Sequence, residues 1–282
     1  MSVTDRVLRR VAASRPVLKV GQQLAAHIDP QTLAQVVPTE FSLDQLDAGK
    51  AALFNIEKGP RGFASAAGLW FNPPVSIWYG ERQVTVRHVS ERIIEVPYVI
   101  SAVLRDTAPG EQVLDFGATE STVSLSLASL GYLVTALDSR GYALEHPNIT
   151  VVRSLVENWE GPARPFDRII AISAIEHVGI GHYDGDETDR VDDLRLIGLF
   201  RRWLAPGKLL TVTVPYGTWG VDDFQRTYDD PHLEALFEGW EIVGRRVFSR
   251  TSPTVWRAGP GGSPAVAMID ARKPEVSPDP RE

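Results

Sequence analysis

The sequence predicts an α/β protein built on a doubly wound, mostly parallel sheet. Two observations lead to this fold class. Short apolar runs alternate with helix-like segments from Gln112 to Val214, with short connections between them, as in consecutive βαβ units. The run over 167–175 is apolar almost throughout, which is typical of a strand that is covered on both faces of a sheet.

Each element of this sheet has its own local signal. Apolar runs of strand length predict five strands, over 113–117, 133–137, 149–152, 167–175 and 209–214. Amphipathic segments predict two helices, over 121–130 and 194–204. We expect Gly131 to end the first helix and Pro206-Gly207 to end the second. The last part of the chain predicts one more helix and two more strands, over 232–237, 240–248 and 265–271.

The region before the sheet is predicted to be an extension that covers residues 1–90. Its patterns predict short helices over 8–20 and 31–37, and a hairpin around Gly80 with strands over 75–79 and 83–86. This hairpin is expected to cover an acceptor site or to form a contact in a homodimer. The main domain then covers 91–272, and a disordered tail covers 273–282.

A helix is predicted to begin the main domain. It extends to Leu104, and Ser90 is the expected N-terminal cap. Pro97 lies inside this segment, where its ring and missing N–H would bend the helix or end it early.

Composition excludes several classes of function. The chain has 282 residues with 29 positive and 36 negative side chains, a net charge of −7, and no cysteine. Disulfides, thiolate zinc sites, iron–sulfur clusters and a cysteine nucleophile are therefore excluded. The acidic balance argues against nucleic acid as a partner, and no apolar run approaches the length of a membrane span. We expect a soluble, cytoplasmic protein whose N-terminus is not a secretory signal.

The residues that follow the predicted strands indicate a cofactor site. Asp115 and Gly117 end the first strand, and Asp138 ends the second. A carboxylate at that second position can accept hydrogen bonds from ribose hydroxyls; the alternative is a structural turn with a capping Asp. A dinucleotide fingerprint needs further glycines, but Thr119 stands in the place of the second. The carboxylate of Asp115, if it points into the turn, would repel a pyrophosphate and suit a cationic ligand.

The segments VLDFGATES, LVTALD, FDRIIAISAIEHVG and WLAPGKLLTVTVP resemble the class I S-adenosylmethionine-dependent methyltransferases, over about residues 90–272. The resemblance is to a little-characterised, small-molecule branch. It implies a Rossmann-like doubly wound sheet of the class I methyltransferase type, mostly parallel with an antiparallel last strand. The implied cofactor is S-adenosylmethionine (SAM), with Asp115 and Gly117 at its methionine end and Asp138 at its ribose. The full set of expected cofactor-binding residues is Asp115, Gly117, Ala118, Thr119, Ser121, Asp138, Ser139, Ser154, Leu155, Val156 and Ser173.

Glu176 and His177 follow the fourth strand, near the position that the resemblance gives to the transferred methyl group. His177 is a candidate general base for an acceptor hydroxyl, because histidine titrates near neutral pH. Glu176 is expected to orient it. The alternative is that His177 caps the loop or bonds a backbone carbonyl.

Two loops supply candidate substrate-binding residues, which are His182, Tyr183, Tyr216, Trp219, Arg226 and Tyr228. Aromatic rings mixed with hydrogen-bonding groups suit a sugar or another ring. The alternative is that Trp219 and Tyr228 pack against the domain while Arg226 pairs with an acid. The acidic loop over 182–193 is read as a lid or as a solvated loop in which Asp192 or Asp193 caps the next helix. No metal is expected; Asp184 and Asp186 would be the ligands if the loop bound Mg²⁺.

These observations favour a SAM-dependent methyltransferase, a transferase that methylates a hydroxyl oxygen of a sugar, glycoside or other small metabolite. Such O-methylation belongs to carbohydrate or natural-product modification. A catalytically degenerate, methyltransferase-like binding or assembly subunit is the alternative. A nicotinamide-dependent oxidoreductase keeps the fold but requires a glycine-rich loop that is absent from the sequence.

Overall fold

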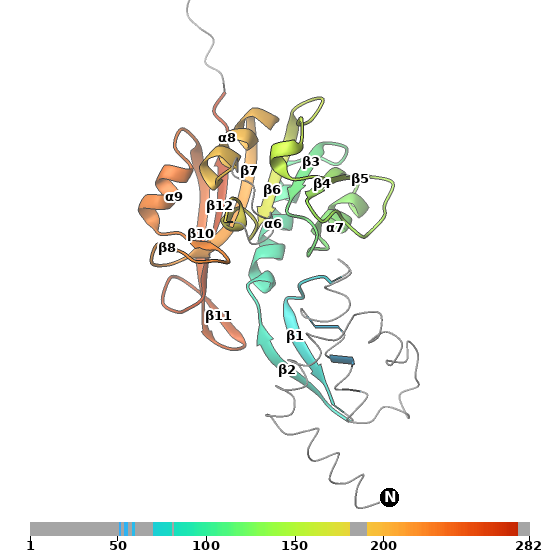
Figure 1. Ribbon diagram of the computed structural model, residues 1–282, viewed down its shortest axis with the longest axis vertical. Coiled ribbons are helices and arrows are strands. Elements are labelled where there is room, and N and C mark those ends of the chain that lie inside the picture. The colour runs from blue at the N-terminus through green and yellow to red at the C-terminus, as the bar shows by residue number, and fades with distance from the viewer. Residues whose placement is uncertain are drawn as a thin grey trace, which may run out of the picture. The chain divides into compact units, whose positions relative to one another are not determined.

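The computed structural model describes residues 51, 54, 55, 58, 59, 70–80, 82–180 and 191–275. The chain divides into two units, Met1–Ser90 and Glu91–Glu282 (Figure 1). The helices predicted over 8–20 and 31–37 lie outside the described residues, as does the tail from residue 276 onward.

The described part of the first unit contains the predicted hairpin. Strands β1 (Val75–Tyr79) and β2 (Val84–Val89) pair in antiparallel fashion. The N–H of Gly80 donates to the carbonyl of Gln83 at 2.8 Å and closes the turn. The side chain of Asn55 binds both main-chain polar groups of Tyr79, at 2.9 Å and 2.8 Å. The side chain of Asn55 thus provides hydrogen-bond partners for the backbone N–H and carbonyl of the last residue of β1.

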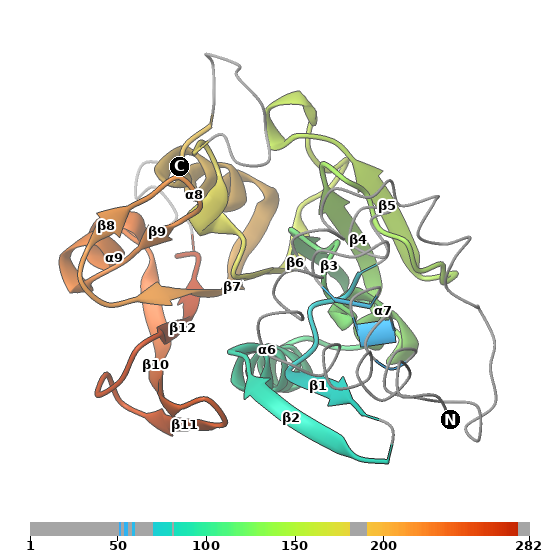
Figure 2. The same cartoon turned by 60° about the horizontal axis from the view of Figure 1, so that its bottom comes forward.

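The second unit contains a sheet of eight strands in the order β11-β10-β12-β7-β6-β3-β4-β5 (Figure 2). Their bounds are β3 (Gln112–Phe116), β4 (Leu133–Asp138), β5 (Ile149–Arg153), β6 (Phe166–Ile172), β7 (Leu204–Tyr216), β10 (Glu241–Ser252), β11 (Val255–Ala258) and β12 (Ala265–Arg272). The first five of these pair in parallel, whereas β12 is antiparallel to both β7 and β10. The predicted Rossmann-like, mostly parallel sheet with its antiparallel last strand is confirmed.

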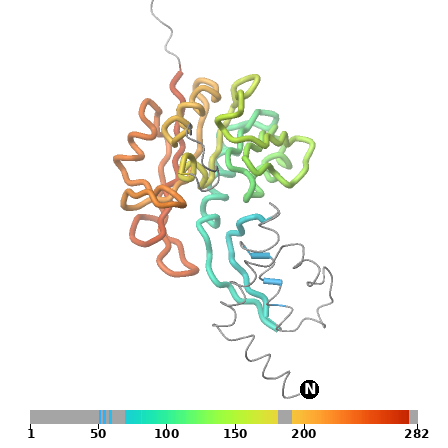
Figure 3. The backbone as a smooth tube through the Cα atoms, viewed as in Figure 1, coloured from blue at the N-terminus to red at the C-terminus, as the bar shows by residue number. Residues whose placement is uncertain are grey.

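Helices cover both faces of this sheet. Figure 3 traces the course of the backbone through these elements. Apolar residues of α6 (Arg92–Asp106) and α7 (Val123–Ser129) pack with Val113 and Ile170 on one face. Residues of α8 (Asp193–Trp203) and α9 (Asp230–Leu236) pack with Leu114 and Ile169 on the other. Neighbouring residues of one strand thus enter opposite cores, because successive side chains of a strand alternate between faces. None of the helices in the described part of the chain is long and apolar enough to span a membrane.

Two predicted boundaries are wrong. Strand β6 ends at Ile172 and not at 175, because Ser173 turns the chain with a φ of 43° and residues 175–177 form a 3-10 turn, η3. Pro206-Gly207 does not end α8, which stops at Trp203; both residues lie within β7, where the Gly207 N–H donates to the Lys273 carbonyl. The short strand β11 was not predicted.

The predicted cap of α6 is also wrong. The hydroxyl of Ser90 donates to the carbonyl of Pro73 at 3.1 Å, and the N-cap is Glu91, without a side-chain cap. Pro97 lies inside α6 as predicted, and the helix continues beyond it to Asp106. Asp192, one of the two expected caps of α8, does accept a hydrogen bond from the Arg195 N–H at 2.7 Å.

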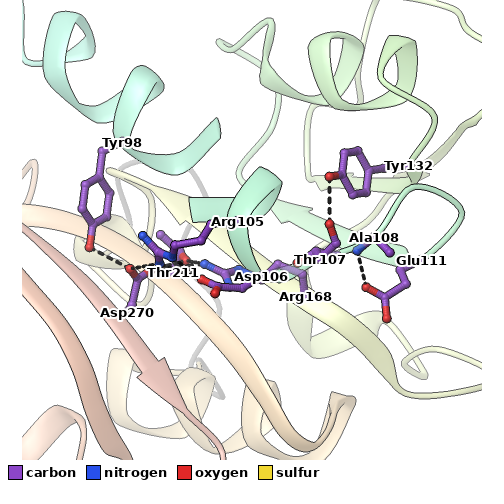
Figure 4. A network of polar contacts seen from close by, with 10 residues as sticks. All are labelled: Tyr98, Arg105, Asp106, Thr107, Ala108, Glu111, Tyr132, Arg168, Thr211 and Asp270. Atoms are coloured by element: carbon purple, nitrogen blue, oxygen red, sulfur yellow. Dashed lines mark hydrogen bonds and ion pairs between the residues drawn. The ribbon is translucent and has the colours of Figure 1, made fainter. Parts of the chain in front are cut away.

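A buried polar network joins α6 to three strands (Figure 4). Asp270 of β12 accepts hydrogen bonds from Thr211 of β7 at 2.6 Å and from Arg168 of β6 at 3.2 Å through Oδ1. Its Oδ2 accepts from Tyr98 at 3.0 Å and Arg105 at 3.3 Å, both on α6. The Arg168 side chain is 0% exposed, so Asp270 supplies the nearest compensating charge inside the domain. Burial lowers the pKa of Arg168, and the charge of Asp270 opposes that effect.

We predict that Asp270→Ala destabilises the domain by about 3–5 kcal/mol, since it leaves the charge of Arg168 buried without its closest partner. The exposed pair of Glu241 and Arg272 on the adjacent strands is the control, and Glu241→Ala should cost less than about 1 kcal/mol. Chemical denaturation of the full chain measures both free energies of unfolding. Equal, small losses in the two variants would contradict a role for the network in stability.

Candidate functional site

The candidate site lies at the carboxyl edge of the sheet, where the strand order reverses. Strands β4 and β5 extend the sheet to one side of β3, and β6 and β7 extend it to the other. Gly117, directly after β3, has a φ of +75°, and a Cβ added there would lie 2.5 Å from the Cβ of Ala174. The loops that follow β3 and β6 therefore touch at this reversal, which is where open α/β sheets bind their ligands.

Asp138, at the end of β4, holds the surrounding turns together. Its Oδ2 accepts a hydrogen bond from the N–H of Thr119 at 3.1 Å, and its Oδ1 accepts from the N–H of Arg140 at 2.9 Å. Its carbonyl accepts from the N–H of Ser154, after β5, at 3.3 Å. One residue thus links the turns after β3, β4 and β5. Nε of Arg140 also lies 3.5 Å from Oδ1. Oδ2 can accept a second hydrogen bond, so that this oxygen keeps capacity for a ligand.

Asp115 lies deeper in the domain than the sequence predicts. Its Oδ2 accepts a hydrogen bond from the hydroxyl of Ser124 in α7 at 2.6 Å, and the side chain is buried. Burial, despite this hydrogen bond, raises the pKa of Asp115 to about 7. The carboxyl group is therefore packed against α7 inside the domain instead of pointing into the turn.

The hydroxyl groups expected to contact a cofactor are used by the protein itself. Thr119 donates through Oγ1 to the carbonyl of Gly141, and Ser121 accepts from the N–H of Val123 at 3.0 Å. Ser154 donates to the carbonyl of Leu155 at 2.8 Å. Of the other expected residues, Ala118 and Val156 are buried and Ser139 and Leu155 are half-buried. What this edge can offer a ligand is mainly the backbone around Gly117 and the carboxylate of Asp138.

The turn after β6 is fastened to α6. The N–H of Ser173 bonds Thr213, whose carbonyl and hydroxyl oxygens both lie 3.0 Å away, and these bonds support its positive φ. The Ser173 hydroxyl donates to Glu95 of α6 at 2.7 Å, and Arg92 donates to the same carboxylate at 2.7 Å. Ser173 is half-buried and already committed to Glu95. Arg92 and Glu95 were not among the predicted site residues, although their spacing of three places them on one face of the helix.

Glu176 is buried in the same region. Its side chain is 1% exposed, and Oε2 has no hydrogen-bond partner among the described residues. Burial, together with the charge of Glu95, raises the pKa of Glu176 to about 8. Oε1 lies 3.8 Å from Nε2 of His177, which is too long for a hydrogen bond. Glu176 does not orient His177 in the expected way.

The ring of His177 is oriented by a main-chain group. Nδ1 lies 2.6 Å from the carbonyl oxygen of Phe224, and the two rings meet edge to face with centroids 4.6 Å apart. A carbonyl oxygen only accepts, so that Nδ1 carries the hydrogen and the neutral ring has its lone pair on Nε2. The backbone-carbonyl bond that was the structural alternative for His177 is present. Because it uses Nδ1, it leaves the other nitrogen as the acceptor.

Two of the expected substrate-binding residues instead hold the loop after β7. Arg226 donates to the carbonyl of Val178 at 2.6 Å and lies 3.5 Å from Asp193. Tyr228 is 1% exposed, and its hydroxyl donates to Asp193 at 2.8 Å. These are the contacts of the structural alternative, in which Arg226 pairs with an acid and Tyr228 packs against the domain.

Two other residues of this loop lie nearer the surface. Trp219 is 37% exposed and stacks on His232, with ring centroids 3.7 Å apart and an interplanar angle of 4°. Asp229 lies 2.5 Å from Nδ1 of His232 and also caps α9. Tyr216 donates to Asp230 at 2.8 Å. The pair of Asp229 and His232, missed in the sequence, has the spacing of three that joins an N-cap to the first turn.

The remaining candidates lie outside the described residues. They are His182, Tyr183, Asp184 and Asp186. Within residues 70–80, 82–180 and 191–275, no group of three or more His, Asp or Glu side chains is arranged to hold a metal ion.

Comparisons with known proteins give the following matches. The family model described as "Caenorhabditis protein of unknown function, DUF268" matches residues 148–256. The search of curated proteins gives no match. A 1,6-didemethyltoxoflavin-N1-methyltransferase from Burkholderia thailandensis, solved with S-adenosylhomocysteine, is 18% identical over 66% of this chain and 79% of its own, with a TM-score of 0.46. The N-methyltransferase NodS from Bradyrhizobium japonicum is 14% identical over 64% and 87%, with a TM-score of 0.43. The strand order of the sheet, rather than these matches, carries the assignment of the fold.

We predict that Gly117→Ala destabilises the domain more than Gly110→Ala does. Both glycines have a positive φ, but a Cβ at Gly110 meets nothing within 4 Å. Gly110→Ala should therefore cost only backbone strain of about 1–2 kcal/mol, whereas Gly117→Ala adds the clash with Ala174. Chemical denaturation measures both, and Ala174→Gly in the Gly117→Ala background should recover part of the difference. Equal losses at the two glycines would contradict a close approach of the two loops.

Proposed function

We propose that the chain is a SAM-dependent methyltransferase that transfers a methyl group to a hydroxyl oxygen of a small acceptor, such as a sugar, a glycoside or another hydroxylated metabolite. The observation that carries the proposal is the position of Asp138. This carboxylate lies at the carboxyl end of β4, bonded to the backbone of the turn that follows β3, beside the reversal of strand order. A carboxylate there with spare acceptor capacity suits the two hydroxyls of a ribose.

The residues of the site fit an adenosyl sulfonium better than a dinucleotide. A pyrophosphate needs close backbone approach at several glycines, whereas Thr119 is buried and bonded to Gly141. The carboxylate of Asp138 at this edge also disfavours a phosphate and favours a cation. Because Gly117 has no side chain, its own atoms do not cover the backbone of the turn at the point where the strand order reverses. Asp138 would hold the ribose, and the backbone around Gly117 would face the methionine end.

His177 is the proposed general base. The bound cofactor supplies a methyl group that is activated by the positive charge on its sulfur. An acceptor hydroxyl loses its proton when its oxygen is methylated, and Nε2 of His177 is the atom proposed to take that proton. The bond between Nδ1 and the carbonyl of Phe224 supports this role, because it stabilises the ring with a hydrogen already on Nδ1. Glu176, buried and with a raised pKa, contributes little negative charge that would compete for the proton at neutral pH.

We predict that the protein binds SAM and S-adenosylhomocysteine in calorimetric titrations, and that it does not bind NAD. Asp138→Ala should weaken SAM binding by about 1–3 kcal/mol, the loss expected when hydrogen bonds to a charged group are removed. The control is Asp167→Ala at the amino end of β6, where the carboxylate accepts from the N–H of Gln112; SAM affinity should not change. If the folded wild-type protein binds neither compound, the methyltransferase proposal fails and the binding or assembly subunit replaces it.

We predict that His177→Ala keeps its affinity for SAM but lowers kcat by about 10²–10⁴, the usual contribution of a general base. The acceptor comes from a panel of monosaccharides, glycosides and phenols that is screened with radiolabelled SAM. His146→Ala, before the amino end of β5 where Nδ1 accepts from the N–H of Asn148, removes an imidazole from the other edge of the sheet and should leave the rate unchanged. Normal turnover of His177→Ala with the identified acceptor would show that another group, or none, takes the proton.

A further inference from the structure

We propose that Asp222 is a positioning residue that fixes the tautomer of His177. The carboxylate of Asp222 shapes a tight turn, and this turn presents the main-chain carbonyl of Phe224 to Nδ1 of the imidazole. The catalytic consequence rests on the proposed function of His177, but the positioning itself does not. Asp222 acts on the orientation of His177 through the main chain of Phe224.

The turn is built around one carboxylate oxygen. Asp222 Oδ1 accepts hydrogen bonds from the N–H of Phe224 at 2.8 Å and from the N–H of Gln225 at 2.7 Å. The N–H of Asp222 donates to the carbonyl of Gln225 at 3.1 Å and closes the loop. The two backbone hydrogen bonds lower the pKa of Asp222, so the group is a carboxylate at neutral pH. Side-chain acceptors of this kind replace a backbone turn and select its geometry.

This turn is the tip of a small hairpin, formed by β8 (Gly220–Val221) and β9 (Arg226–Thr227). The hairpin is attached to the segment after β6 at two points. Phe224 meets His177 through its carbonyl and its ring, and Arg226 donates to the carbonyl of Val178 at 2.6 Å. Arg226 holds the base of the hairpin in place, and Asp222 determines the direction in which the carbonyl at its tip points.

The direction of that carbonyl decides which nitrogen of His177 can act. A hydrogen-bond acceptor at Nδ1 stabilises the form with hydrogen on Nδ1, and only that form has an acceptor at Nε2. Without the carboxylate, the amides of Phe224 and Gln225 lose their acceptor, and the turn relaxes to conformations in which the carbonyl points elsewhere. The imidazole would then populate both neutral forms. A purely structural role for Asp222 predicts instead a loss of hairpin stability with no change in the tautomer.

The experiment compares three variants of the full chain labelled with ¹⁵N-histidine. Asp222→Ala removes the acceptor, Asp222→Asn keeps an oxygen that both amides can reach, and Asp223→Ala removes the same charge from the next position. Comparison with the spectrum of His177→Gln assigns the His177 signals among the six histidines. Two-bond ¹H–¹⁵N correlations, recorded at a pH where the ring is neutral, then report which nitrogen carries the hydrogen.

We expect the wild type, Asp222→Asn and Asp223→Ala to show His177 with hydrogen on Nδ1, and Asp222→Ala to show a mixture. An unchanged His177 pattern in folded Asp222→Ala overturns the proposal. If Asp222→Ala does not fold, Asp222→Glu takes its place, because the longer side chain cannot hold both amides in the same turn.

Measurements of turnover distinguish the positioning role of Asp222 from the proposed role of His177 as general base. With the acceptor identified, Asp222→Ala should lower kcat by about 10- to 100-fold, the range expected when a catalytic group is misplaced. KM for SAM should stay constant, and Asp222→Asn should restore the rate. A changed tautomer with normal turnover leaves the positioning role intact and removes His177 as the base. An unchanged tautomer with reduced turnover overturns the positioning role alone.

Discussion

The contact between Gly117 and Ala174 is the constraint on which the arrangement of the site depends. Two loops from the centre of the sheet, one after β3 and one after β6, approach so closely that a Cβ at Gly117 would lie 2.5 Å from that of Ala174. Glycine alone meets both demands, the positive φ and the lack of a side chain. Because the loops meet, Ser173 must turn away at once with a φ of 43°, and its bonds to Thr213 and Glu95 keep it there. The turn carrying Glu176 and His177 therefore starts from a fixed point.

Asp138 acts on the other side of β3 in a comparable way. A single carboxylate bonds the turns after β3 and β4, and its main chain bonds the turn after β5. Charged acceptors form stronger hydrogen bonds to backbone N–H groups than neutral ones do, so one residue can order three loops. The same carboxylate is the proposed ligand of the cofactor ribose. In this proposal, loss of Asp138 affects both the stability of the edge and its affinity for a cofactor. Asp167 serves as a control because it is also a carboxylate but lies at the opposite edge of the sheet.

The sequence predicts the parts of the fold that depend on local patterns. The apolar runs locate all five parallel strands, and Gly117 and Asp138 mark the ends of two of them. It does not predict contacts that join distant positions through the main chain or through buried charges. The bond between His177 and Phe224 spans 47 positions and uses a carbonyl that every residue possesses. Arg168 and Asp270, 102 positions apart, read as isolated charges in two apolar runs. Tyr228 and Arg226 were ambiguous for the same reason, since tyrosine and arginine serve cores and binding sites alike.

The loop after β7 illustrates how a structural role can serve a chemical one. Tyr228 and Arg226, expected to contact a substrate, instead bond Asp193 and the turn after β6. Although these two residues do not serve as the expected substrate contacts, the loop still belongs to the site, because they hold the hairpin whose tip bonds His177. The exposed face of the loop is formed instead by Trp219 stacked on His232, an aromatic surface of the kind that packs against rings. The interior of the loop thus orients the candidate base, and its exposed face is the proposed place of contact with an acceptor. The two functions need different residues of one segment, and the burial of each side chain determines which function it can serve.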